Sequence, residues 1–478
     1  MRILFATKML EDRAFQPLGV ACLSAALRER GHETFLVDAT SPRAVEEAVR
    51  RVQPRVLAVS TPTARYRFFQ KTAAGIKRRH PDLFVVFGGI HVTLLPESVR
   101  EEGIDAICRG EGDHVLPDLV DRLERGGDVL AAPGCWFKDG DEIRRNAVAP
   151  LIEDLDSLPF ADRTIADGYA YCRRLPVGMF TTGRGCPFRC AFCDNATTRA
   201  LHEPGGRFSR TASPGRAVEE VLRAVRSHGY RRAAFMSEVF ALREDWLRQF
   251  VDLYRRGPAL PFWCMLHPLL IDEARARLLR EAGCRTVMIG IEAGNERIRR
   301  EVLDRPVSNE RIVSDVRVLH RHGIRVQATS ILAFPGTGLA HDLETLDLNR
   351  EAGVDFPDVC VFQPLPGTPL ADRAIELGEF DGDYDALPPT VNPSIRRTVP
   401  RGRPDAELVE RLALLFPLAA KSRVARAILP ALIRLPLRPA YLIAFKLSIA
   451  WYKLRYVSGA RGMADGGLFR ILWAFVRY

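Results

Sequence analysis

The stretch Gly185-Cys186-Pro187-Phe188-Arg189-Cys190-Ala191-Phe192-Cys193 places three cysteines within eight residues. It follows the apolar run 178–182, which is predicted to be a β-strand. Thiolates are soft ligands that suit zinc or an iron–sulfur cluster. Structural zinc takes four protein ligands, whereas three cysteines leave one iron of a four-iron cluster open to chelate an amine and a carboxylate. The residues alone leave open a cluster, which we favour, or a zinc site completed by a remote His or Cys.

Downstream of this stretch, apolar strands alternate with amphipathic helices. The predicted strands are 178–182, 232–236, 262–265, 286–291, 327–333 and 358–363. Six such strand–helix units fit a partial (βα)6 barrel better than a full eightfold one. We therefore predict a barrel domain over residues 175–385.

Residues 1–125 also alternate strand and helix, which predicts a parallel, doubly wound (Rossmann-like) α/β sheet. Such sheets bind ligands at the carboxyl ends of their strands. Three loops are expected there: Ser60-Thr61-Pro62-Thr63, Gly88-Gly89-Ile90-His91-Val92-Thr93 and Gly110-Glu111-Gly112-Asp113. Residues 126–174 are interpreted as a linker with a small hairpin.

Bulk composition sets the class of protein. The 478 residues suggest two or three domains, and 47% hydrophobic and 27% charged residues are typical of a globular chain. Ten cysteines in so long a chain are not a disulfide framework, and most of the seven scattered ones are expected to be buried thiols. No signal-peptide pattern and no apolar run of about 18 residues is present, so we expect a cytoplasmic protein.

The last region, 386–478, is predicted to be helical, apolar and basic. From Lys421 onward it has eleven basic residues and one acid, so this tail alone carries the +10 charge of the chain. Prolines at 417, 430, 436 and 439 are expected to interrupt its helices. Two interpretations remain open for 405–478: a helical cap on the barrel, and peripheral contact with the inner face of a membrane. Nucleic-acid binding is unlikely because the tail is too apolar.

Together these motifs resemble the cobalamin-binding branch of the radical S-adenosylmethionine (SAM) superfamily, over roughly residues 1–385. The cysteines follow its pattern C-x3-C-x-aromatic-C, with Phe192 as the aromatic residue. Further matches, specific in their order and spacing, are 17–19, 88–93, 96–97, 110–112, 213–220, 290–296, 334–337 and 364–370.

The resemblance implies that Cys186, Cys190 and Cys193 ligate a [4Fe–4S] cluster. SAM then binds the open iron, and one electron from an external flavodoxin- or ferredoxin-type donor cleaves it to a 5′-deoxyadenosyl radical. The residues expected to hold these cofactors are Phe192, Ser237, Glu238 and Glu292. A helix-start role for Glu238 remains an alternative.

The resemblance also implies cobalamin bound by the first sheet. Many cobalamin domains carry Asp-x-His-x-x-Gly after the first strand, but the loop 8–19 has no His. Either cobalt lacks a protein ligand, which we favour, or the domain is only structural. The candidate cobalamin-binding residues are Ser60, Thr61, Thr63, Gly88, Gly89, His91, Gly110 and Glu111. We interpret His91 as a contact to the nucleotide tail or a helix-start residue.

The function expected from this pattern is hydrogen abstraction from an unactivated carbon, most simply as a cobalamin-dependent C-methyltransferase. The apolar tail suggests a hydrophobic small molecule as substrate, such as a lipid, isoprenoid or natural product. The alternative is a cobalamin-dependent radical cyclase or oxidoreductase without methyl transfer.

Overall fold

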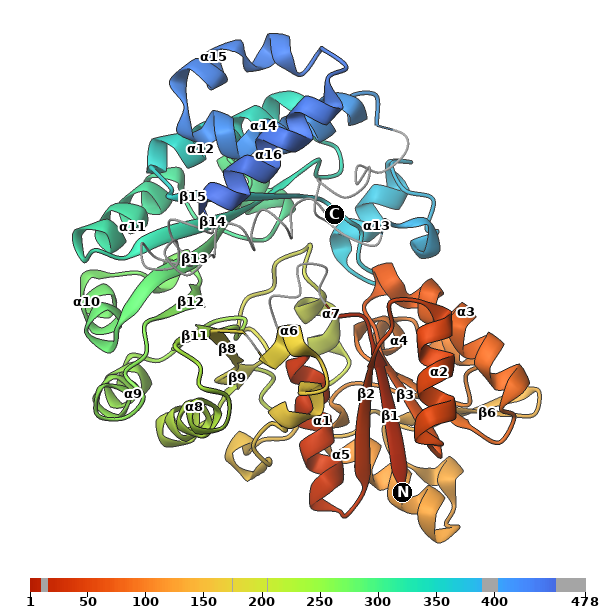
Figure 1. Cartoon of the computed structure of the whole chain (residues 1–478). Coiled ribbons are helices and arrows are strands. Elements are labelled where there is room, and N and C mark those ends of the chain that lie inside the picture. Colours follow the sequence, from red (N-terminus) through yellow and green to blue (C-terminus); the bar gives the residue numbers. More distant parts are fainter. Residues whose placement is uncertain (10–15, 174, 204, 389–402, 453–478) are drawn as a thin grey trace.

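A computed structural model describes residues 1–9, 16–173, 175–203, 205–388 and 403–452. It has two domains built on parallel sheets and a helical C-terminal region (Figure 1). The predicted α/β class and its three structural parts are confirmed.

The first sheet has the strand order β2-β1-β3-β4-β5-β6-β7. Its strands are β1 (Arg2–Thr7), β2 (Glu33–Asp38), β3 (Val56–Ser60), β4 (Phe84–Gly88), β5 (Ala106–Cys108), β6 (Cys135–Asp139) and β7 (Glu142–Arg145). The first five pair in parallel. The order reverses between β1 and β3, and ligands bind such sheets at that switch point, beyond the strands' carboxyl ends.

Helices cover both faces of this sheet. One face packs against α1 (Leu18–Glu29) and α5 (Gly112–Arg125). The other packs against α2 (Pro42–Val52) and α3 (Thr63–Arg79). The short α4 (Ile90–Leu94) follows β4. The five parallel strands are therefore largely buried on both faces, which explains their continuous apolar runs in the sequence.

The hairpin expected in the linker is present, but it belongs to the first sheet. β6 pairs antiparallel with β5, and β7 with β6. Apolar side chains of β6, such as Phe137, complete the core on the α1/α5 face. The linker interpretation missed this because sequence spacing shows a hairpin without showing which sheet edge it joins.

The second sheet has the order β15-β14-β13-β12-β11-β8, and every neighbouring pair is parallel. Its strands are β8 (Val177–Phe180), β11 (Arg232–Phe235), β12 (Phe262–Leu266), β13 (Cys284–Glu292), β14 (Arg325–Leu332) and β15 (Phe356–Val361). The connecting helices are α8 (Pro214–His228), α9 (Glu244–Arg256), α10 (Glu273–Ala282), α11 (Asn309–Arg321) and α12 (Leu339–Ala352). The open, six-stranded barrel is as predicted.

The C-terminal region comprises α14 (Ala406–Lys421), α15 (Arg423–Leu432) and α16 (Arg438–Tyr452). Apolar residues of α14 and α16 share one core with side chains of β14, β15 and α12. The cap on the barrel, one of the two interpretations left open for 405–478, is therefore present in these helices. Residues 453–478 of this region lie outside the described residues. Pro417 and Pro430 lie inside α14 and α15 rather than between helices. Pro417 is buried, and the packing of α14 against the barrel compensates for the hydrogen bond that this proline removes.

A cluster of ion pairs joins the two domains. Arg184 donates to both oxygens of Asp113 over 2.8 and 2.9 Å. Arg210 donates in the same way to Glu111 over 2.9 and 2.8 Å. The acids lie in the loop after β5 and at the start of α5, and the arginines lie in the paired strands β9 (Gly183–Arg184) and β10 (Arg210–Thr211). We call these four residues the interdomain clasp.

The clasp fixes how the two domains are positioned relative to each other near Cys186. Arg184 lies two residues before Cys186. On the same side, α4 contacts α7 (Asp194–Ala200), the helix that follows the third cysteine. A separate ion pair between Arg67 of α3 and Asp385 joins the domains elsewhere. The carboxyl end of the first sheet is thereby fixed against the cysteine loop.

The clasp predicts a large effect of Glu111→Gln on stability. The variant keeps the shape of the side chain but leaves the buried Arg210 guanidinium without its charged partner. Breaking a buried pair of this kind costs about 3 kcal/mol, so the calorimetric unfolding midpoint is expected to fall by roughly 5–10 °C.

The matched control is Glu97→Gln. Glu97 pairs with Arg100 and Arg145 at the surface, where such pairs contribute less than about 1 kcal/mol. Equal midpoints for the two variants would show that the clasp adds nothing beyond a surface ion pair.

Candidate active site

The three cysteines of the loop 185–193 lie between β9 and α7. Cys190 is buried, and Cys186 and Cys193 are half-buried. The loop supplies three thiols, one fewer than the protein ligands that structural zinc takes, whereas a four-iron cluster with one open iron needs three. This donor set fits a multi-iron cluster better than a single zinc ion.

The backbone of the cysteine loop is held from several sides. The Ala191 N–H donates to Leu303 O over 2.9 Å, and the Leu370 N–H donates to Ala191 O over 3.1 Å. The Arg199 guanidinium donates to the carbonyl of Cys186. Gly185 has a φ of +74° and lies so close to Phe208 O that a Cβ would clash, so only glycine fits before the first ligand.

Burial raises the pKa of all three thiols, that of Cys193 to about 12. Without a metal they are therefore protonated at neutral pH. Iron binds the thiolate form, so loading the site releases protons.

Two aromatic residues of the loop pack in different directions. The Phe192 ring lies 6.1 Å from that of Phe334, within a small apolar cluster that includes Leu370. Phe188 stacks on His267 at 3.6 Å. The predicted residue Phe192 therefore anchors the loop to the barrel, and the structure does not test its contact with a cofactor.

The predicted strand-end residues lie at the carboxyl edge of the barrel. Ser237 is buried after β11, and its Oγ accepts a hydrogen bond of 2.7 Å from the Thr182 N–H. Glu238 is exposed, but many protein atoms surround its carboxyl group and this desolvation raises its pKa. Ser237 thus joins the ends of two strands, while Glu238 remains available to a ligand.

Glu292 ends β13 with a φ of +62°, a strained conformation for a residue other than glycine. Its side chain folds back over Gly290, where a Cβ would clash with Oε1. Burial raises its pKa, against the lowering effect of Arg305. Strain and burial of this kind are typical of functional sites, and both support the predicted role.

Two charged or polar residues beside the cysteines were missed by the sequence analysis. Arg305 lies after β13, and its Nη1 is 3.6 Å from Cys190 Sγ. His267 follows β12, and burial lowers its pKa to about 3. Neither belongs to a motif, and Arg305 is one of 69 basic residues, so only the fold identifies them.

The loops of the first sheet fit the predicted cobalamin pocket in part. Gly88 has no atom within 4 Å of its would-be Cβ, so a ligand can approach it. Gly89, by contrast, packs against the backbone of Thr61. The hydroxyl of Thr61 donates to Pro62 O over 3.0 Å. Thr63 is buried at the start of α3, and Ser60 is half-buried.

His91 is buried and stacks on Tyr66 with ring centroids 3.7 Å apart. Its Nδ1 has no hydrogen-bond partner, and burial lowers its pKa to about 4. The imidazole is therefore neutral in α4, the helix-start position that we expected, and one nitrogen remains for a polar ligand.

The structure gives Gly110 and Glu111 a role different from direct cofactor contact. Glu111 belongs to the clasp and also accepts from the Ile152 N–H over 2.9 Å. Burial opposes its ionisation, but the bonds from Arg210 and Ile152 outweigh it and lower its pKa. The would-be Cβ of Gly110 faces His202. Both residues therefore serve the domain interface.

Gln16 is a third residue that the sequence analysis missed. It lies three residues before Gly19, which is the spacing of His to Gly in Asp-x-His-x-x-Gly. Its amide is buried, and neither Nε2 nor Oε1 has a hydrogen-bond partner among the residues that the structure describes. Buried amides without partners are rare in folded proteins. Together with the space at Gly88, this fits a polar cofactor at the switch point.

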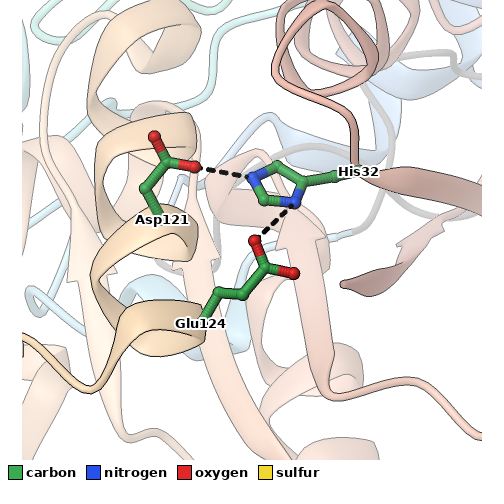
Figure 2. Close-up of side chains that lie close together, drawn as sticks. All are labelled: His32, Asp121 and Glu124. Atoms are coloured by element: carbon green, nitrogen blue, oxygen red, sulfur yellow. Dashed lines mark hydrogen bonds and ion pairs between the residues drawn. The ribbon is translucent and has the colours of Figure 1, made fainter.

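His32, Asp121 and Glu124 form another group of metal-binding side-chain types (Figure 2). Asp121 bonds to His32 Nε2 at 2.9 Å, and Glu124 lies 3.7 Å from the opposite nitrogen, Nδ1. The acids thus pair with opposite nitrogens of the ring, whereas one ion can bind only one of them. We interpret the group as ion pairs that fasten β2 to α5.

Two family models match the chain. A B12 binding domain model matches residues 13–120, and a Radical SAM superfamily model matches residues 180–349. The chain belongs to the cobalamin-binding branch of the radical SAM superfamily. Its cofactors are accordingly a [4Fe–4S] cluster, SAM and cobalamin.

Several known proteins resemble the chain along most of its length. An uncharacterized methyltransferase of Pyrococcus horikoshii is 26% identical over 77% of this chain and 81% of its own. An anaerobic magnesium-protoporphyrin IX monomethyl ester cyclase of Cereibacter sphaeroides is 26% identical over 80% of this chain, which spans 64% of the cyclase. Among solved structures, the methyltransferase TsrM of Kitasatospora setae with cobalamin and a [4Fe–4S] cluster bound has the same fold. Its TM-score is 0.64, with 19% identity over 78% of this chain and 77% of TsrM.

Because the two cofactor sites lie in different domains, we expect Cys186→Ala to affect the cluster but not the binding of cobalamin. The variant is expected to lose most of its iron and sulfide and to stop cleaving SAM, because two thiolates cannot retain the cluster. Hydroxocobalamin binding should persist, because the residues that fit the corrin lie in the other domain. Metal analysis and absorbance after anaerobic reconstitution measure both.

Cys284→Ala is the control for this prediction. It removes a buried thiol outside the loop, so both cofactors should remain. Loss of corrin together with iron in Cys186→Ala would contradict the independence of the two sites.

Proposed function

We propose that this radical SAM enzyme transfers a methyl group from cobalamin to an unactivated carbon of a hydrophobic small molecule. The arrangement of the two domains carries the proposal. The clasp and the contact between α4 and α7 fix the carboxyl end of the cobalamin-binding sheet against the cysteine loop. A substrate between the sheets would face a radical source on one side and a methyl carrier on the other.

The residues at the barrel edge suit the binding of SAM. Glu238 is open to a ligand and Glu292 lies near Arg305, so the edge offers both an anionic and a cationic group to the polar atoms of the cofactor. When bound to the cluster, SAM supplies the radical that abstracts hydrogen. The chain's own contribution is to hold these groups in a partly dehydrated edge between the domains.

The second candidate is a radical cyclisation or oxidation without methyl transfer. It is favoured by the similarity to the magnesium-protoporphyrin cyclase, which extends over 80% of this chain. Both candidates use the same cofactors, and they differ in whether a methyl group leaves cobalamin.

An external flavodoxin- or ferredoxin-type protein would supply the electron. The outer side of the cysteine loop is hollowed between Pro187, Arg199 and Arg207. Arg189, between the first two ligands, is exposed and pairs with Glu203, which also lines the hollow, so three arginines face one acid here. This basic surface beside the cluster suits an acidic electron carrier.

Turnover with SAM carrying a trideuterated methyl group distinguishes the candidates. With an organic extract of the producing cells as substrate source, methyl transfer should yield S-adenosylhomocysteine and 5′-deoxyadenosine together, and a product heavier by the labelled methyl. Mass spectrometry measures all three. Deoxyadenosine without S-adenosylhomocysteine would support the cyclase-type reaction instead.

A membrane surface is the proposed source of the hydrophobic substrate. No helix among the described residues is long and apolar enough to cross a bilayer. However, α15 buries only Leu429, and large apolar side chains are exposed on both outer helices. Those of α15 are Val424 and Ile428, and those of α16 are Ile443, Leu447 and Trp451.

The apolar residues of α16 recur every four positions, so they form one stripe along the helix, opposite the buried Tyr441 and Phe445. From Lys421 to Tyr452 there are six basic residues and no acid. Exposed apolar stripes flanked by cations are typical of helices that lie in the interface of anionic membranes.

Flotation with phosphatidylglycerol vesicles tests this contact. The full chain should float, and a variant with Val424, Ile428, Ile443 and Leu447 changed to Ser should lose most of this binding. The control changes four exposed apolar residues elsewhere, Leu253, Leu269, Ile375 and Leu377, and should float normally. Equal flotation of both variants, or a dimer that only the first variant abolishes, would refute the membrane contact.

A further inference from the structure

The loop after β13 presents one cation to the cysteine site. Arg305 is 6% exposed. Its Nη1 lies 3.6 Å from Cys190 Sγ, and its Nη2 donates to Gly290 O over 2.8 Å. Its Nε has no hydrogen-bond partner within the described part of the chain. The guanidinium is thus fixed on the barrel strand with one edge toward a cluster ligand.

A second arginine makes this loop rigid. Arg299 is fully buried, and its guanidinium donates to the carbonyls of Ala293 and Val307. The Arg305 N–H in turn donates to Arg299 O over 2.9 Å. These hydrogen bonds connect the two ends of the segment between β13 and α11. Moving Arg305 away from Cys190 would therefore require breaking several of them.

Burial determines how strongly the positive charge of Arg305 acts on the site beside Cys190. A cation near a cluster in water is screened, whereas one in the protein interior is not. Glu292 and Asp304 are the nearby acids. Burial raises the pKa of Glu292 and so disfavours its charge, and Asp304 is exposed to solvent, which screens its charge. The positive charge beside Cys190 is thus only partly compensated.

We propose that Arg305 donates a charged hydrogen bond to the Cys190 thiolate of the bound cluster and raises the cluster's reduction potential. Hydrogen bonds to cluster sulfurs and nearby net charge set this potential. One electron from the external carrier enters the cluster and adds one negative charge, and the fixed cation stabilises that charge. Arg305 is a positioning residue that acts through Cys190, and its role requires the cluster but not methyl transfer.

The test compares the reconstituted wild-type enzyme with Arg305→Gln and Arg305→Lys, without SAM or substrate. Iron and sulfide analysis first measures cluster loading. Redox titration with dithionite, followed by electron paramagnetic resonance of the reduced cluster, then gives each midpoint potential. Arg305→Gln is expected to be distinctly more negative than wild type, and Arg305→Lys to lie closer to wild type because it keeps the charge.

Arg300→Gln is the matched control. It removes the same charge from the same loop, but Arg300 is exposed and pairs with Glu301. Its midpoint should equal that of wild type. Equal midpoints for Arg305→Gln and Arg300→Gln would overturn the proposal.

Loss of the cluster is also decisive. If Arg305→Gln does not load iron but Arg305→Lys loads fully with a near wild-type midpoint, a positive charge beside Cys190 is required, as proposed. If both variants fail to load iron, Arg305 is only a scaffold for the loop and the proposal is wrong.

Discussion

The paired carboxylates and guanidiniums of the clasp are the contact on which the active site depends. Glu111 and Asp113 lie three and five residues after the end of β5, and Arg184 lies two residues before Cys186, the first predicted cluster ligand. Bidentate pairs fix both distance and angle. Burying such pairs adds little net stability, but it penalises every arrangement in which they are unpaired. The clasp therefore selects one approach of the two cofactor sites.

In the cysteine loop, backbone contacts position the ligands, and burial sets the chemistry of their thiols. Its backbone is tied to Leu303, Leu370 and Arg199, so the ligands are held before any iron binds. The thiols are protonated in this dry environment, and the adjacent Arg305 favours negative charge there. Burial makes the site inert when empty and makes each nearby charge strong when it is loaded.

The C-terminal helices combine two properties that are usually separate. Their inner sides complete the barrel core with β15 and α12. The outer sides of α15 and α16 keep apolar residues exposed among cations. A helix that is apolar all round is normally buried on every side. The exposed apolar sides of these helices are therefore suited to contact a membrane next to the barrel. Such a surface would place a hydrophobic substrate near the open edge of the barrel.

By itself, the sequence determined the features that are local in the chain. The spacing of Cys186, Cys190 and Cys193 predicted a site for zinc or an iron–sulfur cluster, and the family resemblance implied the cluster. The apolar runs predicted all six barrel strands, because ligand spacing and strand formation depend on neighbouring residues. Only the tertiary structure placed the hairpin in the first sheet, assigned Glu111 to the clasp, stacked His91 on Tyr66 and brought Arg305 to Cys190. Cys190 and Arg305 are 115 residues apart. Partners across such separations are chosen by the packing of the whole fold, and no local pattern records that choice.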